Sequence, residues 1–195
     1  MLNDRNPAPE PPQLASIWNQ TVALGFNMAS DKQTGALLRA LAASKPGGRF
    51  LELGTGTGLS TSWLLDGLDE NAHLLTVDND ASVLAVATAH LGHDARVTIR
   101  HAAGETVLDE LADASLDFIF ADAWPGKYHH LDEALARLKP GGIYFIDDML
   151  PQPNWPEGHA EKAANLVKTL ENRADLTLTQ LAWSTGLIIA TKKTH

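Results

Sequence analysis

The feature that most constrains the fold is an apolar run that ends in three alternating glycines. It spans residues 50–58 and reads Phe-Leu-Glu-Leu-Gly-Thr-Gly-Thr-Gly. An apolar run of this kind predicts a buried strand that turns sharply into a helix. Glycine permits a positive φ and, because it has no Cβ, lets a ligand lie against the main chain. A second apolar run, 74–77, ends at Asp78. Nucleotide-binding α/β folds place there the acid that binds ribose hydroxyls, so the pattern predicts a nucleoside site.

Composition narrows the class of protein. With 195 residues, 44% of them hydrophobic, the chain fits one globular domain. It contains no cysteine, which excludes disulfides, thiolate metal sites and a cysteine nucleophile. A formal net charge of -9 disfavours a nucleic-acid substrate. The sequence has neither a membrane-length apolar run nor a signal-peptide pattern, so we expect a cytoplasmic protein without membrane contact.

The order of predicted elements indicates a Rossmann-like α/β fold. Strands are expected over 49–53, 73–78, 96–100, 116–121 and 142–147, and helices over 59–68, 81–91, 105–111 and 129–138. This alternation predicts a doubly wound, mostly parallel sheet with helices on both faces. The last two apolar runs, 176–183 and 187–191, follow a helix near 160–173 and are only three residues apart. A gap that short predicts an antiparallel hairpin, which completes a seven-stranded sheet.

The segment before the first strand divides into two parts. Residues 1–12 are rich in proline, which predicts a flexible arm. Helices are expected over 13–24 and 33–43, and the second is stopped by Lys-Pro-Gly-Gly at 45–48. We therefore expect a single domain over 13–195, with N-terminal helices in 13–45 and an α/β core in 46–195.

Acidic residues follow most of the predicted strands. They are Glu52, Asp78, Glu105, Asp122, Asp147 and Asp148. Ligands of open α/β sheets bind at the carboxyl ends of the strands, where these acids would repel a diphosphate. A nucleoside with a ribose, an ammonium and a positive sulfonium fits better, and S-adenosylmethionine is that ligand. The Gly-x-Gly-x-Gly spacing also differs from the dinucleotide fingerprint. For any one of these acids taken alone, a helix cap or a solvated loop residue is the better explanation. Asp78 is the exception, because its spacing from the glycine turn fits a ribose-binding acid.

With these residues assembled, the chain resembles the class I S-adenosylmethionine-dependent methyltransferases. More narrowly, it is similar to the small O-methyltransferases of the catechol and caffeoyl-CoA type. The likeness extends from about Met28 to the C-terminus. The Glu-x-Gly-x-x-x-Gly-x-Ser motif of that family is met by Glu52, Gly54, Gly58 and Ser60.

The resemblance implies a set of cofactor-binding residues. Glu52 and Ser60 would hold the methionine end, Asp78 the ribose, and Trp124 would pack on the adenine, although a plain core aromatic is the alternative for Trp124. The full set is Ser30, Glu52, Gly54, Thr55, Gly56, Gly58, Ser60, Asp78, Asn79, Ala103, Gly104, Glu105, Asp122 and Trp124.

The resemblance also implies a catalytic centre. Some members of the family bind a divalent cation, and here Asp122, Asp147 and Asp148 would supply the oxygen ligands for Mg²⁺, Mn²⁺ or Ca²⁺. The family's catalytic lysine falls at Pro125. Lys127 is then the candidate base beside Asp122, and a surface cation is the alternative interpretation for it.

Three hypotheses for function follow from these residues. The first is O-methylation of a small hydroxylated acceptor, with a divalent cation as an optional aid. A nicotinamide-dependent oxidoreductase shares the glycine turn and Asp78, but the chain lacks a Tyr-x-x-x-Lys pair. The third is a non-catalytic protein that binds S-adenosylmethionine. The proline-containing loop 149–159, with Trp155, is expected to be either a wall of the acceptor pocket or a surface loop. The N-terminal helices and the C-terminal hairpin are candidate contacts of a homodimer.

Overall fold

The structure is a computed structural model that describes Asp4 and residues 9–194. It contains one seven-stranded sheet with the strand order β3-β2-β1-β4-β5-β7-β6. The strands are β1 (Arg49–Leu53), β2 (His73–Asp78), β3 (Val97–His101), β4 (Leu116–Ala121), β5 (Leu138–Ile146), β6 (Leu176–Leu181) and β7 (Leu187–Lys192). Strands β1 to β5 pair in parallel, whereas β7 is antiparallel to both β5 and β6. The predicted Rossmann-like sheet with an antiparallel C-terminal hairpin is confirmed.

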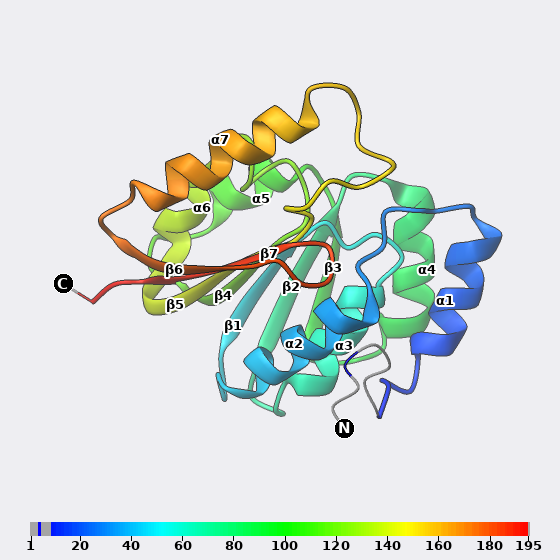
Figure 1. Ribbon diagram of the computed structural model, residues 1–195. Helices are drawn as coiled ribbons and strands as arrows, with labels where there is room; N and C mark the ends of the chain where they lie inside the picture. Colours follow the sequence, from blue (N-terminus) through cyan, green and yellow to red (C-terminus); the bar gives the residue numbers. More distant parts are fainter. Residues whose placement is uncertain (1–3, 5–8, 195) are drawn as a thin grey trace.

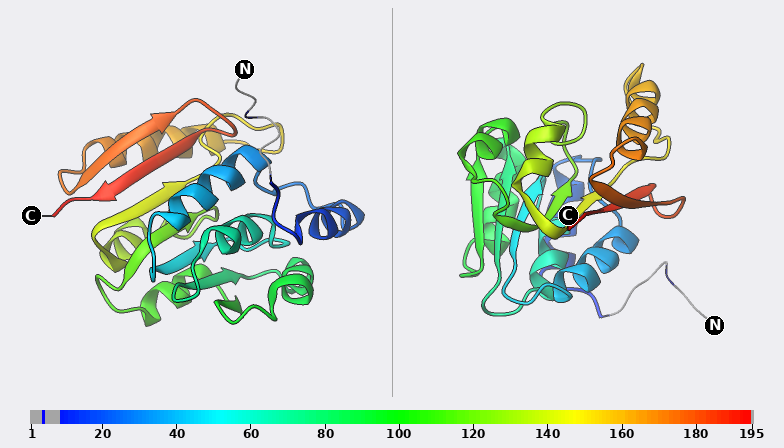
Figure 2. Two further views of the ribbon diagram at one scale, coloured as in Figure 1. Left: turned by 90° about the horizontal axis from the view of Figure 1, so that it is seen from below. Right: turned by 90° about the vertical axis from the view of Figure 1, so that its left-hand side faces the viewer.

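Helices cover both faces of this sheet (Figures 1 and 2). They are α1 (Leu14–Ala23), α2 (Lys32–Ala43), α3 (Leu59–Gly67), α4 (Ala81–Leu91), α5 (Gly104–Glu110), α6 (Leu131–Arg137) and α7 (His159–Glu171). In Figure 1, α5, α6 and α7 lie above the sheet, and α1 to α4 lie on its other side. Helices α3 and α4 connect strands in one direction and α5 and α6 in the other, which is the pattern of a doubly wound fold. Within the described residues no helix is long and apolar enough to cross a membrane.

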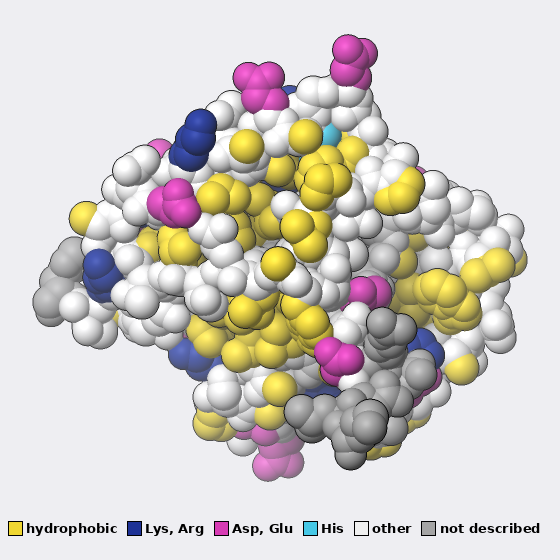
Figure 3. All heavy atoms as spheres, viewed as in Figure 1, with side chains coloured by type: hydrophobic (Ala, Val, Ile, Leu, Met, Phe, Trp, Pro, Cys, Tyr) yellow, Lys and Arg dark blue, Asp and Glu magenta, His cyan; other side chains and the backbone are white. Residues whose placement is uncertain are grey.

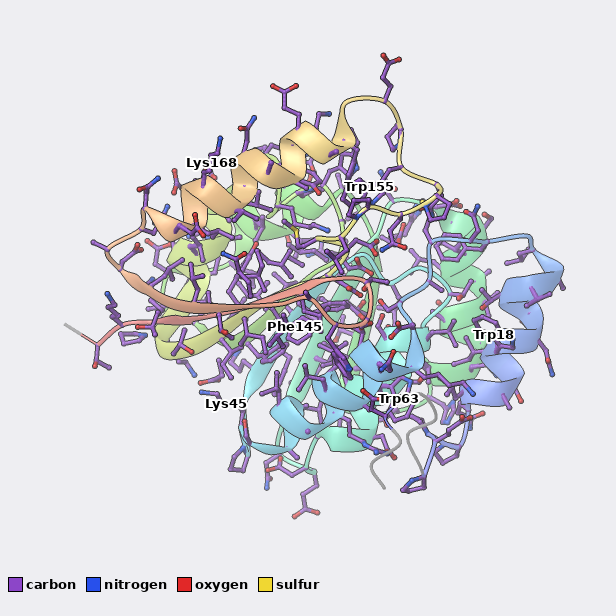
Figure 4. All side chains as sticks on the ribbon, viewed as in Figure 1. Trp18, Lys45, Trp63, Phe145, Trp155 and Lys168 are labelled. Carbon is purple, nitrogen blue, oxygen red and sulfur yellow. The ribbon has the colours of Figure 1, made fainter. Side chains whose placement is uncertain are left out.

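The apolar side chains form one core on each face. On the α1–α4 face, the rings of Phe50 and Phe118 lie 5.4 Å apart, and Phe145 packs edge-on against Phe120 at 5.5 Å. Trp63 of α3 closes this core, as Figure 4 shows, with the Arg39 guanidinium 4.8 Å from the ring centroid. The α5–α7 face is built from aliphatic side chains of the alternate strand positions and the covering helices: Leu51, Leu53, Val107, Leu108, Ile119, Leu135, Ile146, Leu166 and Leu170.

Strand β7 lies inside the sheet, whereas β6 forms its edge. The order follows from burial, because Leu187, Ile188 and Ala190 are all buried and need neighbours on both sides. In β6 only Leu176 is buried, which suits an edge strand with one partner.

Most element boundaries differ from the predicted ones by one or two residues, but one difference is structural. The sequence Lys-Pro-Gly at 139–141 favours a turn before a strand that begins at 142. Instead, β5 begins at Leu138, directly after α6, and its register against β4 shifts between Leu116 and Phe118. Gly141 has a φ of 77°. The predicted turn is therefore an irregularity inside the strand.

The predicted proline-rich arm lies partly outside the described residues. Of the described part, the Lys32 ammonium pairs with Glu10 at 2.5 Å, and Arg39 Nη1 donates to the Pro9 carbonyl. The Trp183 indole N–H donates to Asp4 at 2.7 Å. Glu10 and Pro9 are thus joined to α2, and Asp4 to the loop between β6 and β7.

We predict that replacing Phe145 by alanine destabilises the protein by about 3–5 kcal/mol, because the buried ring leaves a cavity between Phe118 and Phe120. Chemical denaturation of the two proteins measures the difference. As the control, Glu133→Ala on the exposed face of α6 should change the free energy of unfolding by less than about 0.5 kcal/mol. Equal effects of the two substitutions would contradict this assignment of the core.

Candidate active site

The glycine turn joins the carboxyl end of β1 to α3. The amides of Gly54 and Thr55 both donate to the Val77 carbonyl of β2, at 2.9 and 3.2 Å. Gly54 and Gly58 have φ values of 102° and 94°, which side chains rarely adopt. A Cβ at Gly54 would lie 2.9 Å from the Asp122 carbonyl oxygen, and one at Gly58 would lie 3.0 Å from the Ala87 Cβ. The turn is therefore held tightly between β2, the end of β4 and α4.

Glu52 anchors this turn from below. Its side chain is fully buried, and its carboxylate accepts hydrogen bonds from the hydroxyls of Ser60 (2.6 Å), Thr61 (2.5 Å) and Thr76 (2.6 Å). The Thr76 hydroxyl also lies 2.6 Å from that of Thr55. One carboxylate thus connects β1, the first turn of α3 and β2. Burial raises the pKa of Glu52 to about 7, although the three hydroxyl donors oppose the shift.

Asp78 connects the glycine turn to the end of β2. Its Oδ2 accepts the Gly56 amide at 2.8 Å, and its Oδ1 accepts the Asp80 amide at 3.0 Å. Each carboxylate oxygen retains acceptor capacity beyond these bonds. Asp78 is half-buried and faces the cavity, as an acid that binds a ribose would need to be.

A cavity of about 410 Å³ opens at the carboxyl ends of β1, β2 and β4. Most of the predicted cofactor residues line it: Ser30, Gly54, Thr55, Gly56, Ser60, Asp78, Asn79, Gly104, Glu105, Asp122 and Trp124. Three of them do not. Glu52 lies beneath the turn, Gly58 packs against α4, and Ala103 is replaced in the lining by its neighbour Ala102. The contacts of Glu52 and Gly58 are with the protein itself, so they support the wall of the cavity from behind.

Sequence reasoning missed much of the apolar lining. Phe26, Met28 and Ala29 come from the segment between α1 and α2, while Val77 and Val83 come from the end of β2 and from α4. The segment 25–31 is joined to the loop before α7, because the Asn154 side-chain amide donates to the Asn27 carbonyl at 3.1 Å. An apolar position beside the glycine turn looks in sequence like any core position, so no signal distinguished these residues.

The charge of the lining is one-sided. It includes Asp78, Asp80, Glu105 and Asp122, and no lysine, arginine or histidine among the described residues. Such a lining attracts a cation and repels phosphate groups. The predicted ring of acids is therefore partly confirmed, although Asp147 and Asp148 lie outside this lining.

Asp122, Asp147 and Asp148 form an acidic centre with Lys127 next to the cavity. Lys127 is 5% exposed, and its ammonium donates to the Asp147 carbonyl oxygen at 2.7 Å. The Asp147 Oδ1 accepts the Thr185 hydroxyl and the Asp148 amide, and its buried Oδ2 has no hydrogen-bond partner among the described residues. Asp122 accepts the Ser30 hydroxyl at 3.1 Å. The surface-cation interpretation of Lys127 is wrong, because the side chain is buried.

The electrostatics of this centre favour protonation. Burial and the charge of Asp147 raise the pKa of Asp122 well above its usual range, while Lys127 opposes the shift. Burial and the neighbouring Asp148 raise the pKa of Asp147 to about 6. The pKa of Asp148 is also raised by burial. A carboxylate with a raised pKa is a stronger base than a solvated one.

The predicted divalent cation does not fit this arrangement. Within the described part of the chain, no three histidine, aspartate or glutamate side chains converge closely enough to share a metal ion. The Asp147 Oδ1 already accepts two hydrogen bonds, and the Lys127 ammonium, bound to the Asp147 carbonyl, would repel a cation. No step of the chemistry below is therefore assigned to a metal.

An aromatic cluster, made of Trp124, Tyr128, Trp155 and His159, lies beside the acidic centre. The Tyr128 hydroxyl and His159 Nε2 are 2.9 Å apart, and the Trp155 ring centroid is 4.5 Å from that of His159. Figure 4 shows Trp155 on the segment that leads into α7. Trp124 is 45% exposed and lines the cavity, with the Lys162 ammonium 3.9 Å from the ring centroid. The core-aromatic alternative for Trp124 is therefore wrong.

His159 ends the loop 149–159 that was expected to be either a wall of the acceptor pocket or a surface loop, but the sequence predicted no specific role for it or for Tyr128. It is buried, and its Nδ1 has no partner among the described residues. Burial and the nearby charges of Lys127 and Lys162 lower its pKa. The contact with Tyr128 could not be predicted, because the two residues are 31 positions apart in the sequence. The proline-containing loop before His159 has no regular pattern that would place its side chain.

A doubly wound sheet with a glycine turn and an acid-lined cavity at the carboxyl ends of its strands is the arrangement expected of a nucleoside-binding domain. Comparison with known proteins agrees: residues 51–149 match a family described as a methyltransferase domain. The chain belongs to this methyltransferase family.

The relatives bear related names. A Mycobacterium avium protein named "Putative O-methyltransferase" is 33% identical over 139 residues, which are 68% of this chain but 62% of that relative. The chain thus spans less than two thirds of the curated relatives it matches. Among solved structures, a protein of the same name from Klebsiella pneumoniae is 27% identical, with a TM-score of 0.82 and coverage of 96% of this chain and 92% of that one. The O-methyltransferase TomG from Streptomyces achromogenes, solved with S-adenosylmethionine, has 24% identity, a TM-score of 0.82 and coverage of 95% and 92%.

We predict that Glu52→Gln changes how stability depends on pH. Because the folded pKa of about 7 lies above the unfolded value of 4.5, the stabilising contribution is present below pH 4.5 and is lost as pH rises through 7. The upper limit of this loss is about 3 kcal/mol. Thermal melts from pH 5 to 8 should show a smaller decline for the glutamine variant. Parallel declines in the two proteins would contradict the assignment.

Proposed function

We propose that this protein transfers the methyl group of S-adenosylmethionine to an oxygen of a small hydroxylated acceptor. The cavity at the ends of β1, β2 and β4 is the site proposed for the methyl donor. The names of the relatives support transfer to oxygen, and family membership supports methyl transfer over the other two hypotheses.

The observation that carries this proposal is the charge of the cavity. Four carboxylates line it without a basic side chain among the described residues, and residues 54–57 of the glycine turn form part of its wall. A ligand with an ammonium and a sulfonium is attracted there, whereas a pyrophosphate is not. This weighs against a nicotinamide cofactor, whose diphosphate needs a helix N-terminus free of nearby acids.

The proposed chemistry is an in-line displacement. S-adenosylmethionine supplies an electrophilic methyl group on a positively charged sulfur. The acceptor oxygen forms the new bond to the methyl carbon as the carbon–sulfur bond breaks, and that electron pair stays on sulfur. The acceptor's proton passes to a base. The protein contributes by holding the two reactants in line and by excluding water from the buried acids.

Asp122 is the proposed proton acceptor. It is the member of the acidic centre that lines the cavity, and in its ionised form the raised pKa makes it a stronger base than a solvated carboxylate. Lys127 was predicted as a base, but its ammonium donates to the Asp147 carbonyl from a buried position. The divalent cation predicted for Asp122, Asp147 and Asp148 stays a prediction that the geometry disfavours.

The aromatic cluster is the proposed wall for the acceptor. Trp124 is exposed at the rim of the cavity, and the buried His159 at the start of α7 contacts both Trp124 and Trp155, with ring centroids 6.0 and 4.5 Å away. The loop 149–159, which carries Trp155, is bonded at its start to the loop between β6 and β7. The amides of Met149 and Leu150 donate to the carbonyls of Gly186 and Thr185 at 2.9 and 2.8 Å.

A homodimer is proposed through helix α1 and the segment after it. Trp18, Val22, Leu24 and Met28 are each at least half exposed, and apolar atoms gather over α1 in Figure 3. Light scattering on the wild type and on Val22→Glu should show a dimer that the charge disrupts; a monomeric wild type would contradict this proposal. The cytoplasmic location and the absence of a nucleic-acid partner stay predictions.

A ligand titration tests the proposed function. S-adenosylhomocysteine should raise the melting temperature of the protein in a concentration-dependent way, because it binds the folded state alone. NAD and NADP should have no effect. Stabilisation by a dinucleotide and not by S-adenosylhomocysteine would overturn the proposal.

The same titration tests the role of Asp78. Asp78→Ala should weaken binding of S-adenosylhomocysteine by about 10-fold to 100-fold, because it removes a charged acceptor worth about 1.5–3 kcal/mol. Asp109→Ala, which removes an exposed acid from α5, is the matched control and should leave the affinity unchanged. Wild-type affinity in Asp78→Ala would show that the ribose is bound elsewhere.

A further inference from the structure

The structure places the Lys127 ammonium against the Asp147 backbone and within electrostatic range of Asp122, Asp147 and Asp148. The turn that carries it is closed by three backbone bonds: the amides of Lys127 and Tyr128 donate to the Trp124 carbonyl at 3.1 and 2.9 Å, and the Gly126 amide donates to the His129 carbonyl at 2.8 Å. The buried Tyr144 hydroxyl donates to the Gly126 carbonyl from the sheet. The backbone therefore sets the position of this lysine before any ligand arrives.

The lysine side chain is directed into the protein. It is 5% exposed, its ammonium donates to the Asp147 carbonyl at 2.7 Å, and it lies 5.6 Å from the centroid of the Tyr128 ring. A buried ammonium without a counter-charge is strongly unfavourable, so the nearby carboxylates are what make this burial tolerable. A lysine on the exposed surface would avoid this cost of desolvation. Its burial here therefore indicates that its charge has a role next to the three acids.

The ammonium acts on all three acids together. It interacts favourably with the charges of Asp122, Asp147 and Asp148. Its hydrogen bond goes to the Asp147 backbone carbonyl, so it acts on the three acids through its charge and not as a hydrogen-bonded ion pair with one of them. A divalent ion among three carboxylates would serve the same electrostatic purpose, and the ammonium would repel such an ion.

We propose that Lys127 is the resident cation of this acidic centre and takes the place of a divalent ion, so that methyl transfer requires no metal. This inference deepens the proposed function and rests on it. Lys127 is a positioning residue in this scheme. Its positive charge stabilises the ionised form of Asp122, the acid on the cavity wall. The lysine itself does not line the cavity, so it leaves room there for an acceptor. The position that the resemblance assigns to the family's lysine is Pro125, which has no charge to offer.

The test measures cation binding directly. Isothermal titration of Mn²⁺ into the wild-type protein, saturated with S-adenosylhomocysteine, should show no binding below millimolar concentration. Lys127→Gln removes the positive charge that repels Mn²⁺ and leaves the three carboxylates free to turn toward a shared cation, so it should bind Mn²⁺ at least ten times more tightly than the wild type. Lys127→Arg keeps the charge and should bind no Mn²⁺. The matched control is Lys168→Gln on the exposed face of α7, away from the acidic centre, and it should resemble the wild type.

Two binding results would overturn the proposal, and a turnover result described next would do so as well. The binding results are stoichiometric Mn²⁺ binding by the wild type and a folded Lys127→Gln variant that gains no Mn²⁺ binding. If the glutamine variant does not fold, the wild-type titration and wild-type turnover in a chelator still decide. Turnover unchanged by the chelator supports the proposal, and turnover abolished by the chelator and restored by Mn²⁺ overturns it. The binding measurement needs no acceptor, so failure of the proposed function, seen as no binding of S-adenosylhomocysteine, is a separate result.

Discussion

The buried carboxylate of Glu52 is the interaction on which the geometry of the site depends. It gathers hydroxyl donors from two places, the first turn of α3 and strand β2, at a point directly below the glycine turn. Burying this acid is costly, as its raised pKa indicates. The hydroxyls offset part of that cost and at the same time fix the angle at which α3 leaves the sheet. The floor of the cavity is therefore set by a polar contact within an otherwise apolar layer.

The fold was largely predictable because local signals agreed with one another. Alternating strands and helices predicted the parallel body, and the three-residue gap after residue 183 allowed only an antiparallel connection. The position of β7 beside β5 was not predictable from that gap, because either strand of a hairpin can join a sheet. Gly141 shows a second limit: Lys-Pro-Gly favours a turn, but a strand irregularity uses the same residue types, and only the pairing with β4 distinguishes them.

The site was predictable where a residue's role follows from its place at a strand end. Asp78 and the glycines of the turn belong to this group. Glu52 was assigned to the cofactor by resemblance, yet the period of two along β1 puts it on the face of Phe50, toward α3. Contacts such as Tyr128 with His159, or Lys127 with Asp147, join segments at least 20 residues apart through loops. Nothing in a single sequence fixes the register of such loops.

The acids of this region separate into groups by the donors that satisfy them. Glu52 is satisfied by hydroxyls, Asp78 by the backbone amides of Gly56 and Asp80, and Asp147 by Thr185, a backbone amide and the field of Lys127. Glu52 and Asp147 are buried and satisfied by donors of the protein itself, so their role is structural. Asp78 is held by its donors at the cavity wall and keeps acceptor capacity for a ligand. Acidic side chains thus support the glycine turn, line the cavity and form the acidic centre next to it. The donors around each acid determine which of these roles it has.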